Sequence, residues 1–336
     1  DGTRKFQHVV YDAENEVPAL SDKYSVATIK NSLIKLTVDS EPTFVDARSP
    51  YGKGGAIYNA EDSGDFTMTK STFTGNYALY GNAIYNNGNI ITVSSTFKAN
   101  KTASLGSAGG AIYNNSAIET IENSTFTNNE SAYGGAIYNA SDATIKNINK
   151  ITAGNKANAK NIAYQNGGVI YNAGKITDIT NSKLARNEAK YDGGAIYNTG
   201  KLTVKNSQFT DNDAELMGGA IYTEYVTKLA SDTFTSNTAP IGGAIYINAL
   251  PAKKNKISIS KDNFYSNTAT ATGGAIFVEQ GKVAISKSNF GSAASEGNSA
   301  PRGGAVYNAS MTVAEENEKY NRSEEHTSEL QSLAYL

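Results

Sequence analysis

Carboxylates are the first side chains to examine for chemistry, because glycoside hydrolysis needs two of them about 5–10 Å apart on one face. The aspartates of this 336-residue chain are scattered, and among them Asp211 and Asp213 stand two positions apart. The remaining candidates are Asp62, Asp65, Asp142, Asp178, Asp192, Asp232 and Asp262. Asp211 and Asp213 fall at a turn, where a solvated charge is expected, so a polysaccharide lyase or glycosidase is the weaker alternative.

Composition limits the remaining chemistry. The chain has 2 His and no Cys, which excludes disulfides, thiolate metal sites and a Cys nucleophile. Too few histidines remain for a metal cluster or a Ser-His-Asp triad, so we expect no catalytic residue, no metal and no cofactor. The net charge of −2 argues against a nucleic-acid partner. No apolar run reaches the ~18–20 residues of a membrane-spanning helix.

Tyrosine is the residue that recurs with order, inside the hexad Gly-Gly-Ala-Ile-Tyr-Asn. The hexad and its near matches return at intervals of 24 to 33 residues, with a mean near 28. Their first glycines are Gly54, Gly81, Gly109, Gly134, Gly167, Gly193, Gly218, Gly242, Gly273 and Gly303. Such a period is typical of stacked repeats, so the position of each tyrosine must be derived from the repeat.

Two further signals lie between the hexads. One is Phe-x-x-Asn, as in Phe73/Asn76 and Phe264/Asn267, and the other is a short alternating run such as Leu202-Thr203-Val204. Period-two alternation indicates strands, and Gly/Asn clusters indicate turns. Three strands and three turns per unit predict an all-β fold, a single-stranded parallel β-helix of about ten coils. Parallel crossovers are right-handed in most cases, so we expect a right-handed coil.

Side-chain alternation predicts what each hexad residue does. We expect Ile, Asn and the second Gly to face inward, Ala and Tyr to face outward, and the Phe column to stack inside. The Asn residues should form two amide ladders, which stacked rungs permit. The hexad ladder comprises Asn59, Asn86, Asn114, Asn139, Asn172, Asn198 and Asn308, and the corner ladder Asn76, Asn100, Asn129, Asn155, Asn187, Asn212, Asn237 and Asn267.

The outward tyrosines are the candidate binding residues, because tyrosine offers apolar area and a hydroxyl together. The alternative is that they only stabilise the sheet by cross-strand packing. The candidate surface-binding strip comprises Tyr113, Tyr138, Tyr171, Tyr197, Tyr222 and Tyr246. Long units add loops near 155–165 and 249–256, the second a small basic knob.

The pattern divides the chain into four parts. Residues 1–50 are expected to form an irregular coil or N-terminal cap, residues 51–309 the repeats, and 310–321 a C-terminal remnant. The run Arg322–Ser332 resembles the translation of a sequencing-library adapter, so we set aside 322–336, including His326, as not biological. The natural chain is therefore expected to continue beyond this point, and His8 is the one native histidine.

The interleaved Gly-Gly-Ala-Ile and Phe-x-x-Asn signals over residues 51–309 resemble chlamydial polymorphic outer-membrane protein repeats and adhesin-like autotransporter passenger repeats. The resemblance implies a cell-surface, outer-membrane or secreted location and binding to a host-cell, matrix or glycan surface. It implies scaffold roles for the motif residues and no catalysis. Members of that family end in an outer-membrane β-barrel, which leaves open a missing C-terminal barrel. The alternatives are the polysaccharide-active enzyme and a purely structural stalk.

Overall fold

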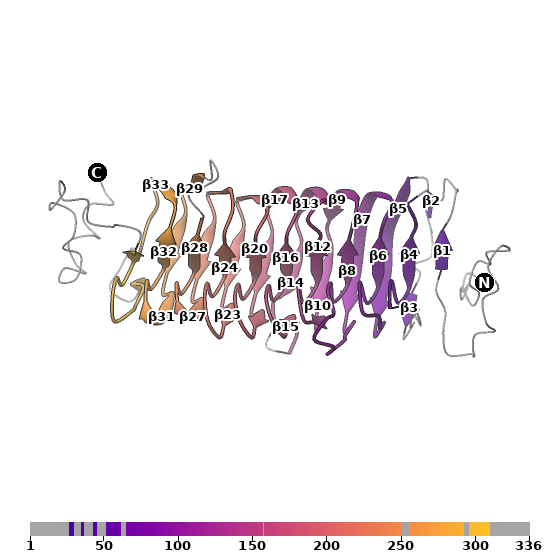
Figure 1. Cartoon of the computed structure of the whole chain (residues 1–336), viewed down its shortest axis with the longest axis horizontal. Helices are drawn as coiled ribbons and strands as arrows, with labels where there is room; N and C mark the ends of the chain where they lie inside the picture. Colours follow the sequence, from indigo (N-terminus) through magenta and orange to yellow (C-terminus); the bar gives the residue numbers. More distant parts are fainter. Residues whose placement is uncertain are drawn as a thin grey trace.

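A computed structural model describes residues 27–29, 35–36, 43–45, 52–61, 65–156, 158–249, 256–291 and 296–309. Over these residues the chain is a β-solenoid of about 9 turns with about 27 residues per turn. All strand pairs are parallel, and each strand pairs with the equivalent strand of the next turn (Figure 1). The all-β parallel coil expected from the repeat is confirmed, and its right-handed sense stays a prediction.

Three sheets run along the solenoid. The hexads form the eleven-stranded sheet: β1 (Ala27–Ile29), β4 (Ile57–Asn59), β6 (Ile84–Asn86), β8 (Ile112–Asn114), β12 (Ile137–Asn139), β16 (Ile170–Asn172), β20 (Ile196–Asn198), β24 (Ile221–Thr223), β28 (Ile245–Asn248), β32 (Ile276–Gln280) and β34 (Val306–Asn308). In Figure 1 these strands form a row of arrows along the molecule.

The alternating runs and the Phe segments share one seventeen-stranded sheet. It contains β2 (Lys35–Leu36), β3 (Thr43–Val45), β5 (Phe66–Thr74), β7 (Asn89–Lys98), β9 (Ala117–Glu122), β10 (Thr125–Thr127), β13 (Thr144–Asn149), β14 (Thr152–Gly154), β17 (Lys175–Thr180), β18 (Lys183–Ala185), β21 (Lys201–Lys205), β22 (Gln208–Thr210), β25 (Thr227–Ala230), β26 (Thr233–Thr235), β29 (Lys256–Ser260), β30 (Asn263–Tyr265) and β33 (Lys282–Ser286). The chain bends between its two walls at residues with positive φ, such as Asn123 (45°) and Lys150 (53°).

A six-stranded sheet follows the corner asparagines, and the sequence did not predict it. It contains β11 (Glu130–Ser131), β15 (Ile162–Ala163), β19 (Glu188–Ala189), β23 (Asp213–Ala214), β27 (Thr238–Ile241) and β31 (Thr268–Thr272). Several of these strands have only two residues, too few for alternation to be visible in the sequence. Each complete rung therefore has four strand segments rather than three.

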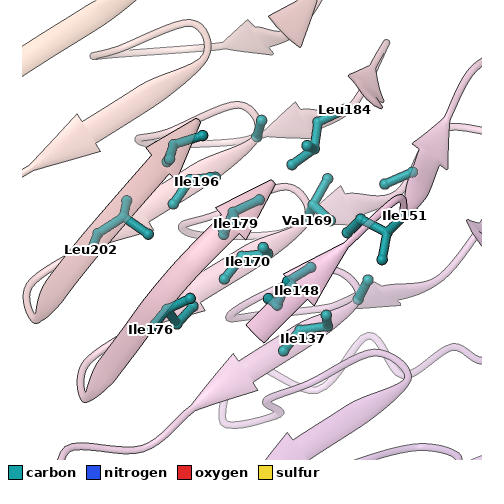
Figure 2. Close-up of a cluster of buried hydrophobic side chains, with 14 of the residues drawn as sticks. Ile137, Ile148, Ile151, Val169, Ile170, Ile176, Ile179, Leu184, Ile196 and Leu202 are labelled. Atoms are coloured by element: carbon teal, nitrogen blue, oxygen red, sulfur yellow. The ribbon is translucent and has the colours of Figure 1, made fainter. Parts of the chain in front are cut away.

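The core confirms the inward columns. The hexad isoleucines from Ile57 to Ile276 are at most 2% exposed, and Phe73, Phe97, Phe126, Phe209, Phe234 and Phe264 are fully buried. Ala153 and Leu184 occupy the Phe position in two turns. Figure 2 shows Ile137, Ile170 and Ile196 from the hexad sheet pointing toward Ile148, Ile176, Ile179 and Leu202 of the opposite wall.

The hexad alanines correct the alternation argument. We expected them outside, but Ala83, Ala111, Ala136 and their equivalents are buried in the core cluster. Gly-Gly-Ala is a turn, not part of the strand, so period-two alternation starts only at Ile. The first Gly takes φ near +65°, and a Cβ on Gly110 would lie 1.9 Å from the backbone oxygen of Gly135. The glycine pair therefore allows the turns to stack closely.

Both amide ladders exist, with two corrections. In the corner ladder each Asn side chain donates to the Asn of the next turn, as Asn187 does to Asn212 (3.0 Å) and Asn212 to Asn237 (3.0 Å). Asn161, not Asn155, fills the ladder between Asn129 and Asn187. Asn155 is exposed, because the inserted residues bulge out before the ladder resumes.

The hexad ladder also ends earlier than expected. It runs from Asn59 to Asn198, which donates to the hydroxyls of Thr223 (3.0 Å) and Thr227 (3.1 Å). Ile247 and Val278 take the Asn position in the next two turns, so Asn308 is separated from the ladder. Asn308 is exposed at the last described rung.

Candidate functional site

The expected column of tyrosines forms one continuous stack on the outer side of the hexad sheet. Successive rings lie 4.6–5.4 Å apart between centroids, with interplanar angles of 1–23°. We call this stack the tyrosine strip; it comprises Tyr58, Tyr85, Tyr113, Tyr138, Tyr171, Tyr197, Tyr222, Tyr246, Phe277 and Tyr307. Because the rings cover one another's faces, the strip presents ring edges and hydroxyls outward.

The six candidate residues differ in exposure. Tyr113, Tyr138, Tyr171 and Tyr197 are half-buried, whereas Tyr222 and Tyr246 are only 6% and 4% exposed. Period-two alternation places a side chain on a face but does not say what covers it. Tyr85, one turn before the six, is also only 6% exposed, so the accessible stretch of candidate residues runs from Tyr113 to Tyr197.

The phenols of the strip are hydrogen-bond donors. Burial, followed by the neighbouring Tyr138 and Tyr133 and by Glu224, raises the pKa of Tyr171 to about 12. Burial also raises the pKa of Tyr113 and Tyr138 above the ordinary value. These hydroxyls therefore stay protonated across the physiological range, and each can donate as well as accept.

Carboxylates cover the C-terminal half of the strip. The Tyr222 hydroxyl donates to Glu224 Oε1 (2.9 Å), the Tyr197 hydroxyl approaches the same oxygen (3.4 Å), and Tyr246 donates to Glu279. Asp192 stands on the other flank, where burial raises its pKa to about 6 and Oδ1 has no hydrogen-bond partner. The stretch from Tyr197 to Tyr246 is therefore acidic, and its phenols are already engaged.

A second column of side chains flanks the strip on its upstream side, and the sequence analysis missed it. It consists of the residue before each Gly-Gly pair and includes Tyr80 and Tyr133. Tyr80 contacts Tyr113 edge-on (5.5 Å, 70°), and Tyr133 contacts Tyr171 in the same way (5.5 Å, 81°). The fixed offset from the hexad was the signal that could have found these residues.

Several of the candidate carboxylates for glycoside chemistry have other partners. Asp211 forms an ion pair with Arg186 (3.2 Å), Asp178 pairs with Lys205 (2.6 Å), and Asp65 accepts from Asn89 (2.6 Å). Asp142 and Asp213 are exposed. Asp62 lies outside the described residues, as do His8 and most of the basic knob.

Asp232 and Asp262 are buried at the bend of the seventeen-stranded sheet. They continue a column of buried serines whose hydroxyls accept N–H groups of the preceding turn, as Ser207 does from Ser182 (3.2 Å). Asp232 accepts from the backbone of Ser207 (2.8 Å) and Ala230 (3.0 Å). Asp262 accepts from the backbone of Asp232 (2.7 Å). These two carboxyl groups therefore link the backbones of successive turns.

Over the described residues no group of three or more His, Cys, Asp or Glu side chains is placed to hold a metal ion. The same part of the chain contains no helix long and apolar enough to cross a membrane. The tyrosine strip, in contrast, has an aromatic ring at every turn from Tyr58 to Tyr307.

The fold defines the chain as a parallel β-solenoid of repeats, and one segment of its sequence is similar to a known protein family. Residues 123–140 match the family model described as the Chlamydia polymorphic membrane protein repeat. The match spans the Phe126/Asn129 corner and the hexad that ends at Asn139, so it contains both sequence signals. The chain thus resembles the repeats of these membrane proteins, as expected from the motifs. Neither the curated proteins nor the solved structures give a match.

Proposed function

We propose that this chain is part of a surface-exposed or secreted, passenger-like protein that uses the tyrosine strip to contact a host-cell, matrix or glycan surface. The unbroken, half-exposed stack from Tyr113 to Tyr197 on the outer side of the hexad sheet is the observation that carries this function. Tyrosine is enriched at binding surfaces because it contributes large area at little cost in conformational entropy.

The repeat likeness supports the location. The matched family is that of a chlamydial membrane protein, which fits a cell-surface or outer-membrane position for the strip. A non-catalytic role is part of the proposal. It is supported by the described carboxyl groups, several of which form ion pairs with Arg or Lys side chains or accept hydrogen bonds from backbone N–H groups. A solenoid of this kind is a rigid support on which a contact surface can extend over several turns.

The test replaces Tyr113, Tyr138 and Tyr171 together by Ser and measures adhesion of the full chain to cultured epithelial cells and to extracellular-matrix coatings. We expect at least tenfold weaker adhesion with the β-sheet circular dichroism retained. The matched control is Tyr265→Ser, a half-buried tyrosine on the seventeen-stranded sheet. Unchanged adhesion of the triple variant, or an equal loss in the control, would reject the strip as the contact surface.

A further inference from the structure

The phenols of the strip divide into an engaged group and an open group. Tyr197, Tyr222 and Tyr246 have carboxylate partners. Over the described residues, the hydroxyls of Tyr113, Tyr138 and Tyr171 bond to no protein group, and none of them is both buried and unpaired. Three donors thus stand open to solvent on successive turns, spaced by the stacking distances of 4.8 and 5.0 Å between rings.

The positions on either side of this open group carry no charge. The upstream flank presents Tyr80, Ala108, Tyr133 and Asn166, and the downstream flank presents Asn87, Asn115, Ala140 and Ala173. Asn115 donates to Asn87 (2.7 Å) on the exposed surface. Charges stand only at the two ends of this stretch: Lys53, the strand neighbour of Tyr80, lies over the Tyr85 ring (5.0 Å), and Asp192 and Glu224 begin the acidic part. A charged partner would lose its hydration here without gaining an opposite charge, so this region favours an uncharged, hydroxyl-rich ligand.

The distance between the two flanking tyrosines, Tyr80 and Tyr133, limits which ligand can contact both rings. Tyr80 pairs with Ala108 and Ala108 pairs with Tyr133, so the two rings stand two strands apart, roughly 10 Å. Their planes are turned by 70° and 81° from the stacked rings of Tyr113 and Tyr171. Since the stacked rings lie across the solenoid axis, the planes of Tyr80 and Tyr133 run along it. The residue between them, Ala108, is small and buried, so no large side chain stands between the two rings on this column.

These observations together select a ligand. We propose that Tyr80, Tyr133 and the open phenols of Tyr113, Tyr138 and Tyr171 bind an extended, uncharged β-(1→4)-linked glycan lying along the solenoid axis. This inference rests on the proposed function and names the ligand class of the same surface. Pyranose C–H faces pack on aromatic rings, and in an extended β-(1→4) chain every second sugar presents the same face. Two rings separated by two strands match alternate sugars, and the phenols match hydroxyls between them.

The test is isothermal titration calorimetry of the full chain with β-(1→4)-linked oligomers of N-acetylglucosamine and of glucose, from dimer to hexamer. We expect affinity to rise with length up to at least four sugars, because a dimer cannot span both rings. The double variant Tyr80→Ala/Tyr133→Ala should bind the hexamer at least tenfold more weakly, whereas Tyr80→Phe/Tyr133→Phe keeps the rings and should retain most of the affinity. Tyr265→Ala is the matched control and should bind like the parent chain.

Three results would overturn the glycan assignment: no heat with either hexamer, equal binding by Tyr80→Ala/Tyr133→Ala, or preference for a sulfated polymer over the neutral oligomers. Adhesion that depends on the strip but is not competed by the hexamers would overturn this assignment while leaving the proposed function standing. Loss of competition in the double alanine variant, with its circular dichroism unchanged, would support both. Failure of adhesion and of glycan binding in the folded parent chain would reject both.

Discussion

Two stacks of aromatic rings run along this solenoid, one inside and one outside. The inner phenylalanines lie 4.8–4.9 Å apart between centroids, and the rings of the tyrosine strip lie 4.6–5.4 Å apart. The spacing is alike because parallel strand pairing sets it in both places. What differs is the environment, since the phenylalanines from Phe73 to Phe264 are fully buried whereas the tyrosines from Tyr113 to Tyr197 reach solvent.

The two stacks also differ in what they tolerate within this one chain. The inner stack is interrupted by Ala153 and Leu184, so that position demands only apolar volume. The strip keeps an aromatic ring at every turn from Tyr58 to Tyr307. Cross-strand packing alone would also accept Val, Ile or Thr on a strand. An aromatic ring at every outer position therefore supports a role in contact beyond the stability of the sheet.

Removing a ring from the inner stack should have the largest effect. Phe209→Ala deletes a fully buried ring that stacks on Phe234, and it should lower the free energy of unfolding by about 3–5 kcal/mol. The outer counterpart, Tyr138→Ala, removes a half-buried ring and should cost about 1–2 kcal/mol. Urea unfolding followed by circular dichroism measures both, and equal losses would erase the distinction between the stacks.

Breaking the corner ladder should come next. In Asn212→Ala, the backbone N–H of Asn187 (3.1 Å) and the carbonyl of Leu184 (2.9 Å) lose their buried partner. Buried groups left unpaired cost about 1–3 kcal/mol, so we expect a loss of about 2–3 kcal/mol in the same urea experiment. Asn115→Ala, on the exposed flank of the strip, is the control and should stay within about 0.5 kcal/mol of the parent. An unchanged free energy of unfolding in Asn212→Ala would contradict a stabilising role of the corner ladder.

The buried aspartates predict a dependence on pH. Burial is the main cause that raises the pKa of Asp232 to about 8, well above the value near 4 of an unfolded chain. The folded state therefore binds this proton more tightly, and the stability that Asp232 contributes below about pH 4 is lost as the pH rises through 8. Replacing it by Ser, the residue that this column has in the preceding turn (Ser207), should flatten the fall in melting temperature between pH 5 and 9. An equal fall in the melting temperature of the Asp232→Ser variant would show that Asp232 is charged over this whole pH range.

Removing a single hydroxyl from the tyrosine strip should have the smallest effect on stability, and it tests whether that hydroxyl contacts a ligand. Tyr138→Phe keeps the stack and removes one open hydroxyl, so the free energy of unfolding should change by less than about 0.5 kcal/mol. If that hydroxyl bonds a ligand, affinity for the β-(1→4)-linked hexamer should fall about fivefold, the equivalent of one neutral hydrogen bond. Calorimetry on the same preparation checks this, and Tyr222→Phe, whose hydroxyl is taken by Glu224, should leave affinity unchanged.

Much of this architecture follows from the sequence, because each column consists of one residue type that recurs at the same position of successive repeats. The inward Ile and Phe columns, the outward tyrosines and the amide ladders follow from period-two alternation and the repeat spacing. The placement of Ala136 does not, since it belongs to a turn rather than to a strand. Asn155 was misassigned to the ladder because spacing from Phe does not say where an inserted loop re-enters, and Asn161 takes that place.

The candidate site was predicted as a column but not as a surface. Exposure depends on side chains from other segments, and the burial of Tyr222 beside Glu224 has no counterpart in the hexad pattern. The repeat pattern did not indicate Tyr80 and Tyr133, because they lie outside the hexad and their column also contains Ala108 and other residue types. The residues that set specificity are therefore those that break the repeat.

The central claim is that the hexads pile up in register even where the repeat length changes. Tyr138 and Tyr171 are register partners although 33 residues separate them, across the longest insertion. The chain has no native Cys, so the variant Tyr138→Cys/Tyr171→Cys can report register directly. Adjacent parallel strands bring the Cα atoms to within disulfide range. We expect mass spectrometry after mild oxidation to show near-complete 138–171 crosslinking, and none in Tyr138→Cys/Asn166→Cys, which follows the mean period instead. Crosslinking of the 138–166 pair, with 138–171 left reduced, would contradict the strip.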